Sequence, residues 1–519
     1  MTMPYETMPP QTLIFFVLFF LPFVALLHVA VKQSVKRSKR KQQQLQADGL
    51  PPSPPGLPFI GHLHLIGFLP HISLRDLAGR YGQDGLMLVR LGSVPTIIVS
   101  SRRATEAVMR THDHLLASRP PSTVAHTLLY GSRDVIFAAY GDHWRRAKKI
   151  LTLHLLTLKK VQSYCIVRED EARVALAKVS NAAEMGQTMD MSELLYSFTF
   201  EVMCRAVSGR SVKLNGTSRL FRELLDVTEM LIGGFNAEDY FPWLLRVGPY
   251  RRAVCARAQK VRKRWDELLD RVMDDHEGKL VQQQVPNFIE VLLSHQHEYG
   301  FTRDHLKALL VDIFVAGTDT SYIVLEFAMV ELMRNPHVMA RLQDEVRHGV
   351  RNSHDMVTED DVMSMAYLKA VIKETLRLHP PAPLLAPHYS VTEIHIDGYM
   401  VPAKTPILIN AWALGQDTSA WEDAEEFKPE RFMDTGSEAT VNFKGSDFKF
   451  LPFGAGRRMC PGINFSLSSI EIMLANLVHR FNWEVPTVMG ETCLDMTEVF
   501  SLTLRRKEKL FLAPKMVGV

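Results

Sequence analysis

Cysteine is scarce in this sequence. The 519 residues include five cysteines, namely Cys165, Cys204, Cys255, Cys460 and Cys493. They are odd in number, lie far apart and form no Cys-x-x-Cys pair. Disulfide frameworks and structural zinc sites need paired, suitably spaced cysteines, so the pattern argues against both and favours a reducing compartment.

The sequence also lacks an excess of charge of either sign. Lys and Arg number 60 against 57 Asp and Glu, a net charge of +3, which gives no case for nucleic-acid binding. With 46% apolar and 23% charged residues, the chain is too apolar for disorder and can bury a large core. It has no internal repeat and no linker beyond about residue 58. Length alone would suggest two or three domains, but we expect one, over residues 58–519.

One long apolar run stands near the N-terminus. Residues 12–31 are almost unbroken in their hydrophobicity and suffice to cross a hydrocarbon core of about 30 Å. Lys and Arg crowd the next ten residues and are missing before the run, so the positive-inside rule leaves the bulk of the chain in the cytosol. A cleaved signal peptide, the alternative, would carry its charges before a shorter run. We therefore expect a single-pass anchor over residues 1–31.

A basic, Gln-rich stretch and then Pro51-Pro52-Ser53-Pro54-Pro55-Gly56 follow the apolar run. Proline fixes φ and favours extended backbone. Residues 32–57 therefore predict a semi-rigid linker between anchor and domain.

Beyond the linker the hydrophobic periodicity is mostly helical, which predicts a mainly α body with a small β part. Strand-like runs are few and short. They are Leu86–Leu91, Thr96–Val99, Ile394–Met400 with an Asp397-Gly398 turn, Ile407–Asn410 and Phe500–Leu504.

The most informative segment is Phe453-Gly454-Ala455-Gly456-Arg457-Arg458-Met459-Cys460-Pro461-Gly462, which precedes an apolar helical stretch. It sets a lone cysteine in a glycine-rich turn beside two arginines. Glycine lets backbone N–H groups approach the sulfur, and cations and a helix N-terminus favour the thiolate. The segment therefore predicts a thiolate ligand to a metal with one open face; the alternative is a tight turn around a structural cysteine.

A long apolar helix is predicted from about Thr302 to Met333, with Thr302 as its N-cap. Its middle reads Ala316-Gly317-Thr318-Asp319-Thr320-Ser321. Glycine and hydroxyl residues weaken a helix interior, so we expect a local kink or bulge there. Its polar groups would face a ligand or, alternatively, pack against a neighbouring helix.

Three charged motifs remain. Glu374-Thr375-Leu376-Arg377 sets a carboxylate and a guanidinium on one helix face, by default a surface pair worth about 0.2–0.5 kcal/mol. Arg431 lies in Phe427-Lys428-Pro429-Glu430-Arg431-Phe432. The basic stretch 142–149 predicts a helix whose positive face is either merely solvated or docks an acidic partner.

Together these motifs resemble the cytochrome P450 monooxygenases, and the resemblance extends from Pro51 to Arg506. It implies the cytochrome P450 fold, mainly α with a small β part and one N-terminal transmembrane helix. It also implies a haem b whose iron takes the Cys460 thiolate as its axial ligand. The signature residues around this cysteine are Phe453, Gly456, Arg458 and Gly462.

The resemblance gives the long helix a catalytic role. Ala316 would line an oxygen-binding groove, and Thr320 and Asp319 would supply the protons that dioxygen cleavage requires.

The resemblance gives other residues structural or haem-binding roles. Glu374, Arg377 and Arg431 would form a buried triad that fixes the structure around the haem. Trp144, Lys148 and His388 would contact haem propionates. Lys148 and His388 depart from the family pattern, which has arginine at both positions, and lysine binds a carboxylate as a point charge rather than a fork.

Substrate contacts implied by the resemblance are mostly apolar, as a small aromatic or terpenoid substrate would require. They are Phe137, Phe235, Val315, Leu384, Leu385 and Phe500.

The chain shows no dinucleotide fingerprint and no flavin domain. NADPH would therefore act only through NADPH–cytochrome reductase, with cytochrome b5 as a further partner. The resemblance implies an endoplasmic reticulum membrane protein whose catalytic domain faces the cytosol.

Within the family, two sequence segments resemble the plant A-type clan. They are Phe314-Val315-Ala316-Gly317-Thr318-Asp319-Thr320 and Asn410-Ala411-Trp412-Ala413-Leu414-Gly415. The flanks Asp312…Tyr322 and Ala386-Pro387-His388-Tyr389-Ser390 are similar to grass hydroxylases that oxidise indole and indolinone in benzoxazinoid biosynthesis. The predicted function is insertion of one oxygen atom from O2 into a small apolar plant metabolite of indole type.

Three alternatives stay open. A haem-thiolate isomerase or dehydratase would need no reductase, but such enzymes commonly lose the threonine that stands here as Thr320. A membrane-anchored haem- or lipid-binding protein without turnover and a helical scaffold without haem are the others. Oxygen consumption that depends on NADPH and added reductase separates the monooxygenase from all three.

Overall fold

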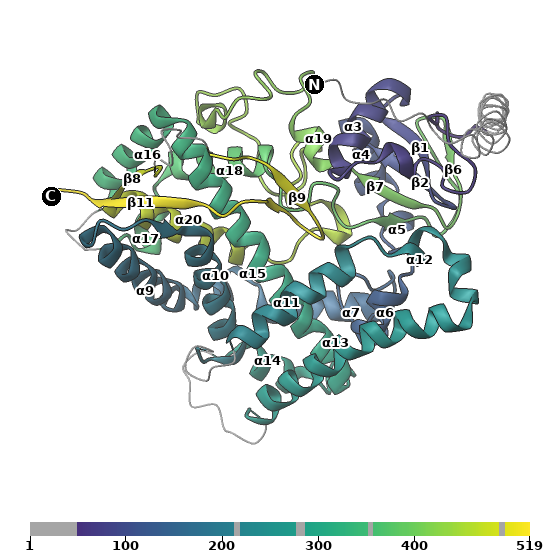
Figure 1. Cartoon of the computed structure of the whole chain (residues 1–519), viewed down its shortest axis with the longest axis horizontal. Coiled ribbons are helices and arrows are strands. Elements are labelled where there is room, and N and C mark those ends of the chain that lie inside the picture. Colours follow the sequence, from purple (N-terminus) through teal and green to yellow (C-terminus); the bar gives the residue numbers. More distant parts are fainter. Residues whose placement is uncertain (1–48, 212–217, 277–285, 351–355, 487–493, 519) are drawn as a thin grey trace, which may run out of the picture.

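The computed structural model describes residues 49–211, 218–276, 286–350, 356–486 and 494–518. The predicted anchor and residues 32–48 of the predicted linker lie outside the described residues. Figure 1 shows a body of helices with a small sheet at one side, next to α3 and α4. The mainly α architecture with a small β part is the one that the sequence predicted.

The described chain contains helices, short 3₁₀ and π turns (η) and strands in the following order. The helices are α3 (Pro70–Tyr81), α4 (Arg102–Glu106), α5 (Asp113–Leu116), α6 (Thr123–Leu128), α7 (Asp142–Ile150), α8 (Leu158–Gln162), α9 (Cys165–Glu184), α10 (Met191–Ser208), α11 (Ser218–Gly233), α12 (Ala237–Tyr240), α13 (Gly248–Asp274), α14 (Phe288–His295), α15 (Arg303–Arg334), α16 (Pro336–Gly349), α17 (Glu359–Val362), α18 (Ala366–Leu378), α19 (Ala411–Gly415) and α20 (Ile463–Arg480). The strands are β1 (Leu86–Leu91), β2 (Val94–Val99), β3 (Met189–Asp190), β4 (His388–Tyr389), β5 (Ile394–Ile396), β6 (Tyr399–Val401), β7 (Pro406–Ile409), β8 (Phe481–Glu484), β9 (Glu498–Phe500), β10 (Leu504–Arg506) and β11 (Phe511–Met516). The η turns are η2 (Leu63–Leu65), η3 (Ala107–Thr111), η4 (Leu151–Leu155), η6 (Pro242–Arg246), η7 (Pro429–Phe432) and η8 (Gly456–Arg458).

The long helix α15 forms the axis of the body. It begins after its N-cap residue Thr302, whose N–H donates to His305 Nδ1 (3.1 Å), and it ends before Pro336, as predicted. It is long and apolar enough to cross a membrane, but 83% of its most apolar stretch is buried inside the chain. It is therefore a core helix that other elements surround.

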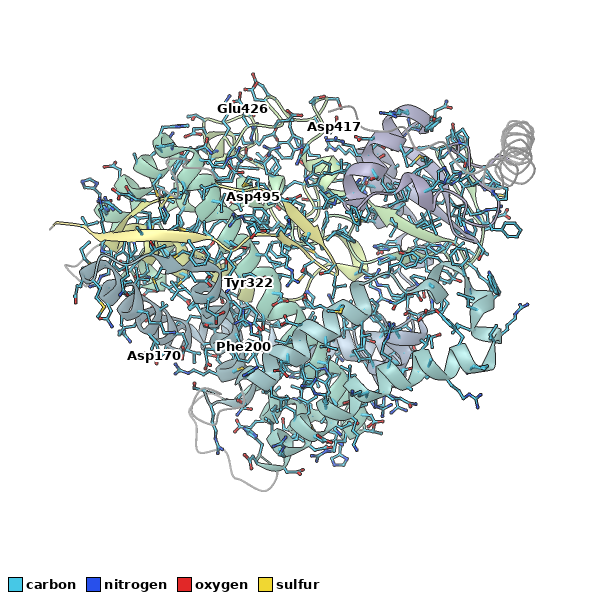
Figure 2. The ribbon with its side chains drawn as sticks, in the orientation of Figure 1. Asp170, Phe200, Tyr322, Asp417, Glu426 and Asp495 are labelled. Atoms are coloured by element: carbon cyan, nitrogen blue, oxygen red, sulfur yellow. The ribbon has the colours of Figure 1, made fainter. Side chains whose placement is uncertain are left out.

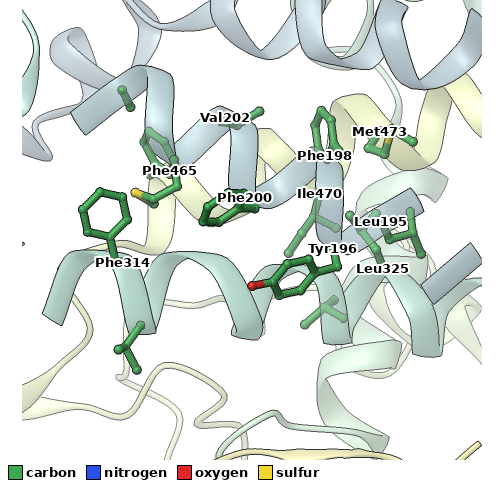
Figure 3. Packing of buried hydrophobic residues seen from close by; sticks show 14 of the residues in the cluster. Leu195, Tyr196, Phe198, Phe200, Val202, Phe314, Leu325, Phe465, Ile470 and Met473 are labelled. Atoms are coloured by element: carbon green, nitrogen blue, oxygen red, sulfur yellow. The ribbon is translucent and has the colours of Figure 1, made fainter. Parts of the chain in front are cut away.

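The core around α15 is built mainly by α10 and α20. Figure 3 shows Phe198 of α10 beside α20 and Phe200 of α10 above α15, with Phe314 of α15 and Phe465 of α20 in the same cluster. All four are at most 5% exposed. Burying one such side chain contributes about 1.5–3 kcal/mol, so this packing fixes α15 against the helix that follows Cys460.

The main sheet has the strand order β1-β2-β7-β4. β1 and β2 form an antiparallel hairpin with Leu86 opposite Val99, and β7 pairs with β2 in parallel. β5 and β6 form the predicted hairpin around Asp397-Gly398. Two N–H groups, those of Leu88 and Met400, donate to the carbonyls of Pro52 (2.8 Å) and Gly49 (2.7 Å), so the proline-rich segment packs on these strands.

The prediction of a single strand over Phe500–Leu504 is wrong. β9 ends at Phe500 and β10 begins at Leu504, and the N–H of Ser501 donates to Thr503 O (2.9 Å) in the turn between them. The alternating Phe-Ser-Leu-Thr-Leu pattern has the period of a strand, but here the chain reverses within it.

The β9–β10 turn approaches the end of α11 very closely. A Cβ atom added to Gly233 would lie 2.1 Å from the backbone nitrogen of Leu502, and backbone cannot move aside as a side-chain end can. Gly233 thus sets the distance between α11 and the turn.

We expect Gly233→Ala to lower the free energy of unfolding by about 1–3 kcal/mol, the usual cost of overpacking. The control is Gly79→Ala in α3, where an added Cβ meets nothing within 4 Å. This control should stabilise the protein by about 0.5–1 kcal/mol because alanine restricts the unfolded chain. Thermal unfolding followed by circular dichroism measures both, and equal effects of the two variants would contradict the close approach.

Candidate active site

A cavity of about 310 Å³ lies between α15 and the turn that carries Cys460. Residues from several separate parts of the chain line it. They include Met109, Arg119, Val135, Ile136, Trp144 and Lys148; Asp312, Ile313, Ala316, Gly317, Thr320, Ser321 and Val324; Leu376, Leu385, Ala386 and His388; and Phe453, Gly454, Arg458, Cys460, Pro461 and Gly462.

The cysteine turn has the geometry that its glycines predicted. Gly454 and Gly456 have φ of 66° and 64°, in the left-handed region that favours glycine. A Cβ on Gly456 would lie 2.4 Å from Met109 O. The N–H of Cys460 donates to Phe453 O (3.0 Å), and the N–H of Gly462 donates to the Cys460 sulfur (3.4 Å). α20 begins one residue after Gly462, so its N-terminus also lies beside the sulfur.

Burial raises the pKa of the Cys460 thiol, while the Gly462 N–H and Lys148 act to lower it. The thiol is accessible, and it lines the cavity. The turn therefore presents a sulfur to the cavity with a cation and an N–H donor behind it, and a bound metal would take it as the thiolate.

Two residues predicted to contact haem propionates bind the chain's own backbone. Trp144 Nε1 donates to Val135 O (3.0 Å), and Lys148 Nζ donates to Met459 O, next to Cys460. Burial lowers the pKa of Lys148 to about 8, against the attraction of Cys460. Both side chains line the cavity, but Lys148 lies on its sulfur side and supports the turn.

Two buried guanidinium groups, those of Arg458 and Arg119, also line the cavity. Arg458 donates to the carbonyls of Ala117, Val135 and Ala138, and Arg119 donates to those of Ile136, Ala386 and Pro387. Burial, with the neighbouring Arg458, lowers the pKa of Arg119 to about 9, and burial lowers that of Arg458 to about 10.

His388 completes this side of the cavity. Its Nδ1 lies 3.1 Å from Leu116 O, and burial next to Arg119 lowers its pKa to about 3. It is therefore a neutral hydrogen-bonding group at physiological pH. Arg119 was missed by sequence reasoning, because one arginine among 60 scattered basic residues carries no distinguishing pattern.

These residues fit a haem. Carbonyl oxygens are the hydrogen-bond partners that the structure gives to Arg119 and Arg458. Asp134 lies near both guanidinium groups, and Asp113 and Asp312 also lie near Arg458, so these charges are offset through space and not by direct ion pairs. A group with carboxylates would pair with them, since charge-assisted bonds of this kind are roughly twice as strong as neutral ones. The Cys460 sulfur faces the same cavity and supplies the ligand for iron.

The opposite wall of the cavity belongs to α15. Ala316, Gly317 and Thr320 line it, and the Thr320 hydroxyl donates to Ala316 O (2.7 Å). The helix runs without interruption from Arg303 to Arg334, so the predicted bulge at residues 316–321 is wrong. Burial of Thr318, Asp319 and Ser321 and the bond from the Thr320 hydroxyl to the main chain keep these weak helix formers helical.

Asp319 does not line the cavity. It is 4% exposed and forms a hydrogen bond with Glu229 of α11, which is equally buried. Burial is the main cause that raises the pKa of each carboxyl. Glu229 was also missed, because no sequence spacing relates it to a residue on α15.

The structure brings Glu374, Arg377 and Arg431 together. Arg377 Nε lies 2.7 Å and Arg431 Nε 3.0 Å from Glu374, and all three side chains are buried. The two guanidinium groups also donate to main-chain carbonyls between Gly415 and Glu426. The triad thus ties α18 to the segment that leads toward the cysteine turn.

Of the six predicted substrate contacts, Leu385 lines the cavity. Leu384 and Phe500 pack in a neighbouring cluster beneath the sheet, Val315 is buried in the core, and Phe137 packs against the core. Phe235 is 66% exposed and stacks on Tyr240 (4.8 Å between ring centroids). The described cavity instead takes its apolar lining from residues such as Ile136, Ile313 and Val324.

Comparison with known proteins agrees with this site. The family model described as cytochrome P450 matches residues 51–512. The indole-2-monooxygenase of Zea mays is 54% identical over 469 residues, which cover 89% of this chain and 87% of the relative. From the same plant, 3-hydroxyindolin-2-one monooxygenase is 48% identical (94% and 93% covered) and indolin-2-one monooxygenase 47% identical (96% and 94% covered).

A solved structure of a zebrafish cytochrome P450 with abiraterone superposes with a TM-score of 0.73 at 23% identity, covering 87% of this chain and all of that one. This likeness concerns the fold. The family match and relatives of nearly equal length show that the chain belongs to the cytochrome P450 family, the haem-thiolate monooxygenases.

Proposed function

We propose that this enzyme inserts one oxygen atom from O2 into a small aromatic substrate of indole type, with electrons from NADPH through a reductase. The observation that carries the proposal is one cavity with the Cys460 sulfur on one side and Thr320 on the other. The indole and indolin-2-one monooxygenases among the relatives, at 47–54% identity, support the substrate class.

The haem would be held by residues on the sulfur side of the cavity. Cys460 would ligate the iron, and Arg119, Arg458, His388 and Trp144 would surround the carboxylates. When bound, haem with a thiolate ligand supplies the electron density that favours O–O cleavage.

The opposite wall, which α15 forms, would bind the substrate and transfer protons to the cavity. The apolar side chains Ile313, Val324 and Leu385 exclude water and suit a planar aromatic ring. Thr320 Oγ can accept a hydrogen bond from a group in the cavity, because its own proton is engaged with Ala316 O. Asp319, the neighbouring acid, would pass protons inward.

Electrons would enter on the side of the cysteine turn. Arg145, Arg146 and Lys149 of α7 are exposed there, and Lys148 of the same helix reaches Met459. A positive surface of this kind steers an acidic partner such as NADPH–cytochrome reductase. The predicted anchor would hold enzyme and reductase on the same face of the endoplasmic reticulum membrane.

The substrate class is tested by titrating the ferric enzyme, in membranes, with indole and indolin-2-one while recording the Soret band. We expect a low-spin to high-spin shift with at least one of them and none with an unrelated terpenoid. A thiolate-type spectrum that neither indole shifts would contradict the substrate class. A folded protein with no haem spectrum would contradict the function itself.

We expect the buried triad of Glu374, Arg377 and Arg431 to be required for haem retention. Arg377→Ala removes one of the two arginines that bind the buried Glu374 and leaves three main-chain carbonyls without their donor, at a cost of about 3–5 kcal/mol, so haem per polypeptide should fall sharply. Arg173→Ala is the matched control, because its ion pair with Asp170 is exposed. Haem content from the absorption spectrum, against protein mass, measures both, and normal haem content in Arg377→Ala would refute the role of the triad.

The exposed basic residues of α7, Arg145, Arg146 and Lys149, predict that reductase binding depends on their charge. Lys149→Glu should weaken reductase binding by about 1 kcal/mol, a factor of about five in the KM for reductase, and reduce its dependence on salt. Lys260→Glu on α13 makes the same charge change elsewhere and should leave the KM unchanged. Reduction rates at several reductase concentrations and ionic strengths decide the matter; equal behaviour of both variants would place docking on another face.

A further inference from the structure

Three elements meet behind the α15 wall of the cavity: α11, α15 and the β9–β10 hairpin, which Figure 1 shows next to one another. Glu229 of α11 and Asp319 of α15 face each other there, each 4% exposed, and share a hydrogen bond. Two carboxyl groups bond to each other only when one of them carries a proton. The pair therefore stores a proton one residue away from Thr320.

No other donor satisfies these buried oxygens of the pair. Glu229 Oε1 and Asp319 Oδ1 are buried, and among the described residues no N–H or hydroxyl group donates to either. Leaving a buried acceptor unpaired costs free energy, and a structural polar contact would avoid that cost. The geometry suits a pair that exchanges protons better than one that only cross-links two helices.

The surroundings of the pair connect it to the surface. Around Glu229 and Asp319 lie Asp226 and Arg222 of α11, Arg505 of β10, Tyr322 of α15 and Tyr196 of α10. Tyr322, labelled in Figure 2, forms a hydrogen bond with Arg505. Asp226 is exposed, and Arg505 and Arg222 are partly exposed, so charged groups extend from the pair to solvent.

The charges around the pair favour different protonation of its two members. Burial, the Asp319 charge and the bond to Asp319 raise the pKa of Glu229. Burial also raises the pKa of Asp319, but the bond from Glu229 and the cations Arg505 and Arg222 oppose this. At neutral pH Glu229 is the protonated partner.

We propose that Glu229 is the proton donor that recharges Asp319 during turnover. This inference rests on the proposed function, since it needs a reaction that consumes protons in the cavity. Glu229 acts through Asp319 and does not reach the cavity, so it is a positioning residue and not a catalytic one.

The transfer balances simply. The O–H bond of Glu229 breaks, and its proton forms an O–H bond on the Asp319 carboxylate. Asp319 then releases this proton toward Thr320 and is a carboxylate again. The Glu229 carboxylate takes a proton from solvent on the side of the exposed Asp226, and one proton has entered for each proton consumed.

The Glu229→Gln variant tests the acidic proton of Glu229 separately from its hydrogen bond to Asp319. The amide keeps the size of the side chain and donates an N–H to Asp319 as the protonated acid does, but it has no proton to release. The matched control is Glu223→Gln on the same helix, where Glu223 is exposed. Asp319→Asn is the third variant, and all are used as holoenzyme in membranes with reductase.

Infrared spectroscopy of the holoenzyme tests the stored proton directly. Wild type and Glu223→Gln should show the carbonyl stretch of a buried protonated carboxylic acid, shifted in D2O. Because the buried Asp312 also has a raised pKa, the Glu229 band is read from the difference spectrum, where Glu229→Gln should lose intensity that Glu223→Gln retains. A band that persists unchanged in Glu229→Gln would overturn the assignment of the proton.

Turnover tests the relay. Glu229→Gln should bind haem and indole as wild type does, but its product formed per NADPH should fall about tenfold, with peroxide released instead and a larger solvent isotope effect. If Asp319→Asn shows this loss and Glu229→Gln does not, the relay through Glu229 is wrong while the proposed function stands. If neither variant forms less product per NADPH, proton entry through Asp319 is wrong as well, and so is the relay through Glu229.

Discussion

Arg458 holds the cysteine turn in place. Its guanidinium group donates to the carbonyls of Ala117, Val135 and Ala138 and lies 4.5 Å from the centre of the Trp144 ring. Trp144 in turn donates to the same Val135 carbonyl. One side chain two residues before Cys460 thus joins the turn, the segment 117–138 and α7. These are three of the parts that surround the cavity, and their relative position depends on keeping this charge buried.

The cavity is electrically asymmetric, and this asymmetry follows from how each side is held. Lys148, Arg119 and Arg458 lie on the sulfur side, where main-chain carbonyls orient them and nearby aspartates such as Asp134 offset part of their charge. The side behind α15 holds the acids Glu229 and Asp319. A cofactor with carboxylates and an acidic electron donor suit the first side, and proton supply suits the second. Electrons and protons would therefore reach the reacting atoms from opposite directions.

The sequence predicted features whose signal is local. Glycines with a cysteine, a capped helix up to Asn335-Pro336, and the β1 and β5–β6 strands depend on residues close in the chain, and the structure agrees with them. Contacts between distant segments carried no such signal. Arg119 reaches Pro387, and Glu229 reaches Asp319, only because the fold brings them together. The same reason explains the substrate list: Val315 and Leu384 adjoin cavity residues in sequence, yet face the core.

Thr320 shows why the acids behind α15 matter. Its hydroxyl proton is committed to Ala316 O, which both keeps the helix intact and leaves the oxygen able only to accept. A threonine hydroxyl also has no proton to lose at physiological pH. Thr320 can therefore position a hydrogen-bond donor in the cavity but cannot be the source of the protons. That source has to be a titratable group within reach, and we assign it to the buried pair of Asp319 and Glu229, which shares one proton.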